Sequence, residues 1–81
     1  MSVKEAYEKV CEYMNERPVV VMCREYRNTF GFFVAPPGSE PGGVAYVGGS
    51  MICVDKTKGD VFTRDDPRYA KLYGTRWIRV N

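Results

Sequence analysis

The first part of the chain places apolar residues with the spacing of an α-helix and charged residues on its other faces, which is typical of an amphipathic helix. Ser2 and Glu5 have the spacing of a capping box, in which each side chain accepts a hydrogen bond from the other residue's backbone N–H. Pro18 disfavours helical dihedral angles at Arg17 and so ends the helix. The pattern predicts a helix over residues 3–16. Its apolar positions are Val3, Ala6, Tyr7, Val10, Cys11 and Met14.

Two segments of strand length follow the helix. Residues 19–26 and 29–35 are rich in β-branched and aromatic residues, and Arg27 and Asn28 lie between them. Because asparagine tolerates a left-handed conformation, we expect this pair to form the tip of a β-hairpin. The first strand begins with apolar residues on both of its faces, so we expect it to begin in the centre of a sheet.

Proline and glycine then dominate residues 36–43, which predicts the one long loop of the chain. Residues 44–47 predict a short strand after this loop. Residues 50–54 and 61–64 predict a second hairpin. Its turn contains Gly59, which can take the positive φ that a bulged hairpin loop requires.

The last third of the chain predicts a short helix. Asp66 can serve as its N-cap, Pro67 suits the first helical position and Gly74 suits the residue after its end. Residues 76–80 alternate in polarity, which is compatible with a last short strand. The apolar stripe of the short helix would be Tyr69, Leu72 and Tyr73.

Together these elements predict a single domain over residues 1–81. We expect an α+β fold, with the N-terminal helix packed on an antiparallel β-sheet of about five strands and a short C-terminal helix. A chain of 81 residues is one domain by length, and 44% hydrophobic residues are too many for a disordered chain.

Targeting signals and cysteines bear on the compartment. The longest apolar run has the length of a strand, and charged residues follow Met1 closely where a signal peptide would have an apolar stretch. Three widely spaced cysteines cannot all pair, so we expect Cys11, Cys23 and Cys53 to be buried, reduced thiols. These observations favour the cytoplasm and no contact with a membrane.

The chemistry open to the chain is limited by the lack of histidine. This excludes Ser-His and Cys-His nucleophile pairs and most zinc sites. Neither a phosphate-binding loop motif nor a dinucleotide-binding glycine motif is present. We therefore expect a protein that is not an enzyme and that has no catalytic residues, no cofactor and no metal.

Charge is distributed unevenly along a chain of net charge +2. An acidic ridge runs along the predicted N-terminal helix, and it either solubilises the helix or contacts a basic partner. A basic cluster interleaved with aromatic residues near the C-terminus suggests an alternative function, that of a small nucleic-acid-binding module. The low net charge of the chain argues against this function. The ridge comprises Glu5, Glu8, Glu12 and Glu16. The cluster comprises Arg64, Arg68, Lys71, Arg76 and Arg79, with Tyr69, Tyr73 and Trp77.

Two motifs in the middle of the chain carry a family resemblance. The sequence TFGFFV over residues 29–34 and the sequence GGSMICVDKTKGDV over residues 48–61 resemble the immunity protein 35 family of bacterial polymorphic toxin systems. The order of helix, strands and glycine-marked hairpin is similar over about residues 3–73. The resemblance implies a small cytoplasmic protein that binds and inhibits a cognate bacterial toxin.

A binding protein of this kind needs only a fitted surface, so we expect a protein partner. The candidate contacts are Glu40 in the long loop, Tyr46 after it, Glu8 and Glu12 on the acidic ridge, and Arg64 and Trp77 in the basic cluster. The competing interpretation makes the loop a simple crossover and Tyr46 part of the core. A homodimer that pairs through an exposed strand edge is a further possibility. The identity of the toxin stays open.

Overall fold

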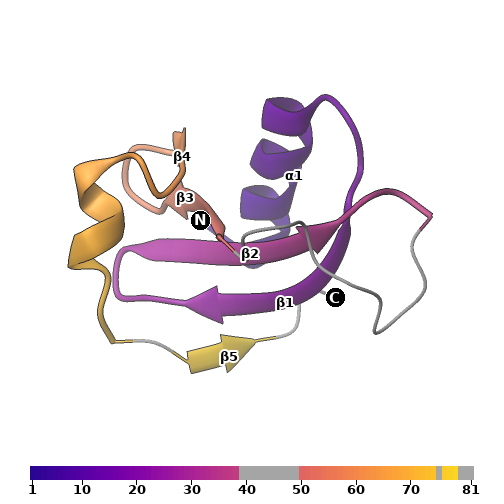
Figure 1. Cartoon of the computed structure of the whole chain (residues 1–81). Helices are drawn as coiled ribbons and strands as arrows, with labels where there is room; N and C mark the ends of the chain where they lie inside the picture. The colour runs from indigo at the N-terminus through magenta and orange to yellow at the C-terminus, as the bar shows by residue number, and fades with distance from the viewer. Residues whose placement is uncertain (39–49, 75, 79–81) are drawn as a thin grey trace.

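The computed structural model describes residues 1–38, 50–74 and 76–78. Figure 1 shows the helix α1 (Val3–Met14) on one face of an antiparallel sheet of order β4-β3-β2-β1-β5. The predicted α+β class, with an N-terminal helix packed on an antiparallel sheet, is confirmed. The strands are β1 (Val19–Glu25), β2 (Thr29–Ala35), β3 (Ile52–Asp55), β4 (Val61–Phe62) and β5 (Arg76–Ile78), and the 3₁₀-helix η1 (Pro67–Lys71) lies between the last two.

The ends of α1 follow local chemistry. At its start, the Ser2 hydroxyl accepts from Glu5 N and a Glu5 carboxylate oxygen accepts from Ser2 N, so the predicted capping box is confirmed. The predicted end near residue 16 is wrong by two residues, because Asn15 takes a left-handed conformation (φ 56°) and stops the helix before Pro18 is reached. Within the described ranges, no helix has the length and apolar character needed to cross a bilayer.

The centre of the sheet is β2, not β1. Among the described residues, β5 pairs with β1 from Cys23 to Glu25, and β2 pairs with it from Val19 to Glu25. The register shifts between Val20 and Met22, which places Val21 and Met22 together opposite Phe33 as a β-bulge. Val21 is 36% and Met22 is 42% exposed. The expectation that this strand begins in the sheet centre is therefore wrong, because β2 holds the central place and two of the apolar residues of β1 are exposed.

The second hairpin is shorter than its sequence pattern suggests. Its turn closes with Gly59 at φ 75°, as predicted, and β4 ends at Phe62 because residues 63–66 form the next turn. Asp66 caps η1 and Pro67 opens it, as predicted, but the element is a five-residue 3₁₀-helix rather than an α-helix. The predicted strand over residues 44–47 lies outside the described residues.

Apolar side chains cover both faces of the sheet. On the α1 side, Val10 and Ala6 pack against a buried cluster centred on Phe32. On the opposite face, a smaller cluster that includes Met51 and Phe62 is covered by side chains from η1 and the residue after it. The helix therefore supplies one layer of the core, and η1 supplies the other.

The three cysteines are buried and unpaired, as expected. Burial raises the pKa of Cys23 and of Cys53 to about 12 each. At neutral pH both are therefore protonated, and their role in the structure is that of small apolar side chains.

Candidate functional site

The densest group of charges lies where the β3–β4 hairpin meets η1. Arg68 projects from η1 and donates to three aspartates, with N···O distances of 2.9 and 3.0 Å to Asp60, 3.0 and 3.1 Å to Asp66 and 3.3 Å to Asp55. All five guanidinium N–H groups are used by these contacts. The guanidinium also stacks on the Phe62 ring, 4.2 Å from its centroid. We call Arg68 and these three aspartates the Arg68 cluster.

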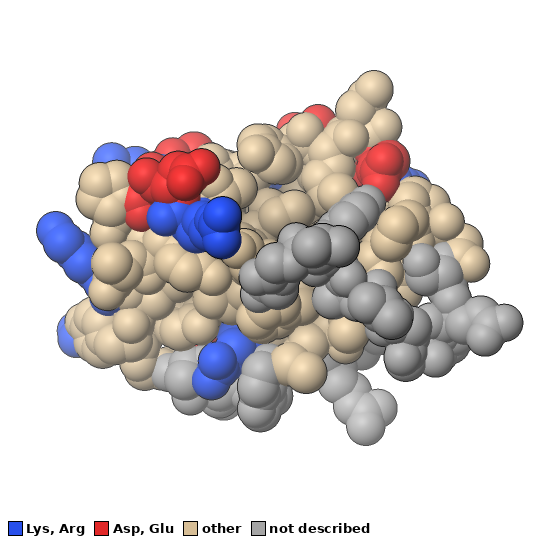
Figure 2. Space-filling view, viewed as in Figure 1, with Lys and Arg blue, Asp and Glu red and all other residues tan. Residues whose placement is uncertain are grey.

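The hydrogen bonds within the Arg68 cluster shift the pKa values of its members. The bond from Arg68 is the main cause that lowers the pKa of Asp60 and of Asp66 below the ordinary aspartate value, and these two partners raise the pKa of Arg68. Figure 2 shows acidic and basic side chains together over the end of the molecule that carries β4 and η1. Because Arg68 is shared by three carboxylates, the Arg68 cluster holds the hairpin to η1, carries an excess of negative charge and does not present a free cation.

Replacing Arg68 with glutamine is expected to lower the urea midpoint of unfolding at pH 7, because three carboxylates lose their shared cation. The lowered folded-state pKa of Asp60 and Asp66 means that their contribution to stability is complete above the ordinary aspartate pKa. It is lost as the pH falls through the folded-state values. The difference between wild type and variant should therefore shrink between about pH 5 and pH 2.

Arg64 provides the control for this measurement, because it is exposed and its side chain forms no hydrogen bond or ion pair with the described residues. Arg64→Gln removes the same charge and should leave the urea midpoint and its pH dependence close to those of the wild type. Midpoints for Arg68→Gln that run parallel to the wild type at every pH would show that the Arg68 cluster contributes nothing to the pH dependence.

A shallow, open hollow of about 320 Å³ is lined by α1, β4 and the turn after β4. Tyr13 lines it from α1 and is 56% exposed, although it is a large aromatic side chain. Asp65 and Asp66 line it from the turn. Asp66 is engaged by Arg68, whereas Asp65 is exposed and makes no ion pair with any described residue. We call this the Tyr13 hollow.

The acidic ridge of α1 is partly neutralised by the chain itself. Arg17 donates to both carboxylate oxygens of Glu8, at 3.1 and 2.9 Å, and this hydrogen bonding is the main cause that lowers the pKa of Glu8. Glu5 is engaged in the capping box. Glu12 is exposed, and its side chain forms no hydrogen bond or ion pair with the described residues, so its carboxylate is open to a partner.

The predicted contact residues lie on separate parts of the molecule. Glu8 and Glu12 lie on the outer side of α1, and Arg64 lies in the turn after β4. The backbone of Trp77 pairs with Arg24 in β1. Glu40 and Tyr46 lie outside the described residues, as does the side chain of Trp77.

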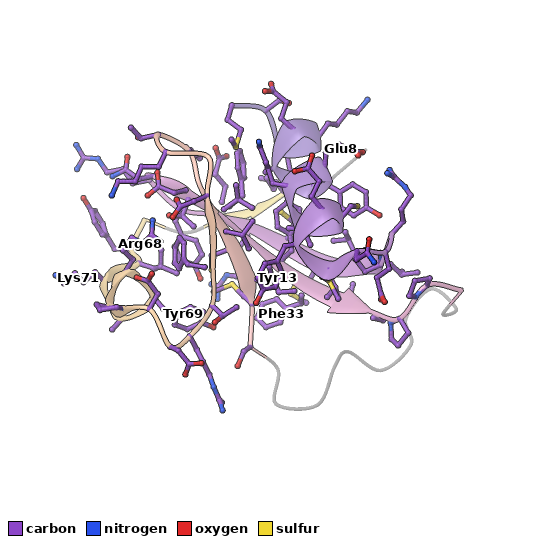
Figure 3. The ribbon with its side chains drawn as sticks, turned by 90° about the horizontal axis from the view of Figure 1, so that it is seen from above. Glu8, Tyr13, Phe33, Arg68, Tyr69 and Lys71 are labelled. Carbon is purple, nitrogen blue, oxygen red and sulfur yellow. The ribbon has the colours of Figure 1, made fainter. Side chains whose placement is uncertain are left out.

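Sequence reasoning missed Tyr13. The signal was present, because Tyr13 falls outside the apolar stripe of the helix and so places an aromatic ring at the border of its polar side. Figure 3 shows that Glu8 and Tyr13 lie on different sides of α1. Only the position of the turn after β4 reveals that this ring faces a hollow.

Comparison with known proteins adds no relative. Among protein-family models, curated proteins and solved structures, nothing matches this chain. The case for its function therefore rests on the motifs of the sequence and on the geometry of its surface.

Proposed function

We propose that this protein is a toxin-neutralising immunity protein, which binds a cognate bacterial toxin domain and inhibits it by covering its surface. The resemblance to the immunity protein 35 family suggests this function. The observation that carries it is the exposed ring of Tyr13 beside the Tyr13 hollow. Tyrosine is enriched among the residues that dominate binding energy at protein interfaces, where one ring fills a matching space on the partner.

The charges around Tyr13 favour a basic patch on the partner. Glu12 on α1 and Asp65 on the turn carry carboxylates that no described residue neutralises. A lysine or arginine of the toxin could enter the Tyr13 hollow, pair with Asp65 and lie over the face of the Tyr13 ring. Complementary charge also speeds encounter, which suits an inhibitor that must act before damage is done.

A stable interface of ordinary size covers more than the Tyr13 hollow. Such an interface takes about 800 Å² from each partner, which compares with 5290 Å² for the whole surface of this protein. Exposed residues of α1 and of the turn after β4, among them Glu12 and Arg64, are available to extend such an interface. The long loop over residues 36–43, with Glu40 and the following Tyr46, stays a predicted contact.

The contacts of Arg68 argue against the alternative function of nucleic-acid binding. Arg68, in the middle of the basic cluster, gives all five N–H groups to aspartates and has none left for a phosphate. A protein partner therefore remains the better-supported proposal.

A growth-rescue experiment tests the proposal. A candidate toxin domain found beside the gene for this chain would be expressed in a bacterial host with and without this protein, and the two purified proteins would be titrated by calorimetry. We expect rescue of growth and a one-to-one complex. Tyr13→Ala is expected to weaken the complex by about 30-fold or more, as for other dominant interface residues.

Tyr73→Ala is the matched control, because Tyr73 is 57% exposed but belongs to a different surface. This variant should bind the toxin as the wild type does. Equal losses in the two tyrosine variants would remove the Tyr13 hollow from the interface. Genes beside this one that encode no toxin, or a toxin domain that the protein neither binds nor neutralises, would contradict the proposed function itself.

The contribution of the loop can be measured with the same toxin. Replacing residues 37–42 with a Gly-Ser linker of equal length should weaken binding if the loop touches the toxin. Unchanged affinity in a folded variant would leave α1 and the turn after β4 as the binding surface.

A further inference from the structure

A second hollow, of about 300 Å³, borders the Arg68 cluster. The β1–β2 turn, residues 26–29, lines one side of it, and residues 71–73 at the end of η1 line the other. Asp55 and Arg68 also contribute to its lining. We call this the Arg27 pocket.

The two charged groups shared with the Arg68 cluster are not available to a ligand. One carboxylate oxygen of Asp55 accepts from the backbone N–H groups of Thr57 and Lys58, at 2.8 and 2.9 Å, and the other accepts from Arg68. Arg68 has no donor left. Among the lining residues, the charges of Asp55 and Arg68 therefore offset each other.

Two cationic side chains that line the Arg27 pocket form no ion pair with a carboxylate of the described residues. Arg27 is held in place by Tyr73, because its Nη1 donates to the Tyr73 hydroxyl at 3.0 Å and its guanidinium lies 5.9 Å from the centre of that ring. No carboxylate pairs with Arg27 in the described part of the chain. Lys71 is exposed and has no ion pair there either, and Figure 3 shows it at the outer edge of η1.

Apolar surface lies next to these two cations. The ring of Tyr26, the side chain of Leu72 and the ring of Tyr73 all line the Arg27 pocket. A side chain with an apolar stem and an anionic end would fit both features. The methylenes would contact the rings, while the carboxylate would accept from the planar donor pair of Arg27.

We propose that the Arg27 pocket binds an acidic peptide segment of a protein, with one glutamate or aspartate side chain inserted beside Arg27. Lys71 lies at the rim, where it would meet a neighbouring carboxylate of the same segment. The volume lies at the lower limit for pockets that enclose small molecules, which favours one side chain of a longer chain over a free ligand. This proposal does not depend on the toxin, because the Arg27 pocket and the Tyr13 hollow share no lining residue.

The test is an NMR titration of the full chain with an acetylated, amidated tetraglutamate peptide as the probe. We expect amide shifts confined to residues 26–29 and 71–73. Arg27→Gln and Lys71→Gln should each lower the affinity for the peptide by about three- to tenfold. Lys4→Gln, which removes the same charge from the exposed side of α1, should change the affinity less than twofold. Spectra of the free variants establish that each is folded.

Four results would overturn the proposal. Shifts spread over the whole surface, or equal losses in all three variants, would mean that the peptide responds only to net charge. Inorganic phosphate that produces the same shifts at the same concentration would identify a general anion site instead of a peptide site. A tetralysine peptide that binds equally well would exclude recognition of carboxylates.

Discussion

Replacing Phe32 with alanine is expected to lower the free energy of unfolding by about 3–5 kcal/mol. Phe32 is 0% exposed, and it lies in the central strand β2, between Cys23 of β1 and Ile52 of β3. Its ring centre is 6.4 Å from that of Tyr7 on α1, so the substitution leaves a cavity between the helix and the sheet. A domain of this size has a total stability of only about 3–5 kcal/mol. The variant should therefore be largely unfolded at 25 °C by circular dichroism and urea titration.

Phe33 is the internal comparison, because it is the next residue of the same strand but lies half-buried on the opposite face. Phe33→Ala should cost clearly less than Phe32→Ala. If the unfolded fraction prevents measurement, Phe32→Leu gives a smaller loss in the same direction. Equal losses for the two alanine variants would be inconsistent with a core centred between α1 and the sheet.

Replacing Gly31 with alanine is expected to lower the free energy of unfolding by about 1–3 kcal/mol. A Cβ atom at this position would lie 2.5 Å from the Met51 sulfur and 3.3 Å from Cε2 of Tyr26. Both neighbours are buried, and the Tyr26 hydroxyl donates to the same sulfur at 3.6 Å, so neither side chain moves without breaking other contacts. Denaturant midpoints of wild type and variant measure the effect.

A double-mutant cycle identifies the cause. In a Met51→Ala background the sulfur is absent, so the additional cost of Gly31→Ala should fall to a small fraction of its value in the wild type. If the two substitutions are simply additive, the cost of Gly31→Ala comes from the backbone and not from contact with Met51.

The sequence determined the elements whose causes are local. The capping box at Ser2 and Glu5, the hairpin tip at Asn28, the positive φ of Gly59 and the cap at Asp66 all involve residues within about four positions of each other. Such interactions form in the same way whatever the rest of the chain does. They were sufficient to predict an α+β domain with its helix and most of its strands in order.

The ends of the elements, and which of their residues are buried, depended on more than the spacing of apolar residues along the chain. Asn15 ends α1 through a left-handed conformation that a helical pattern does not reveal. The bulge at Val21 sets two residues of β1 against one residue of β2, and both of these β1 residues are exposed although they belong to the apolar run. The central position of β2 follows from pairing between strands, to which the composition of one strand is a weak guide.

The candidate sites were decided almost entirely by tertiary structure. By sequence, Arg68 was one cation among several in a basic cluster, whereas in the fold Asp55 and Asp60 reach it only because the β3–β4 hairpin returns against η1. Tyr13 was one aromatic residue outside the helical stripe until the turn after β4 placed a hollow beside it. Local chemistry specifies which elements form, but a surface is made by residues far apart in the chain, and long-range packing alone brings them together.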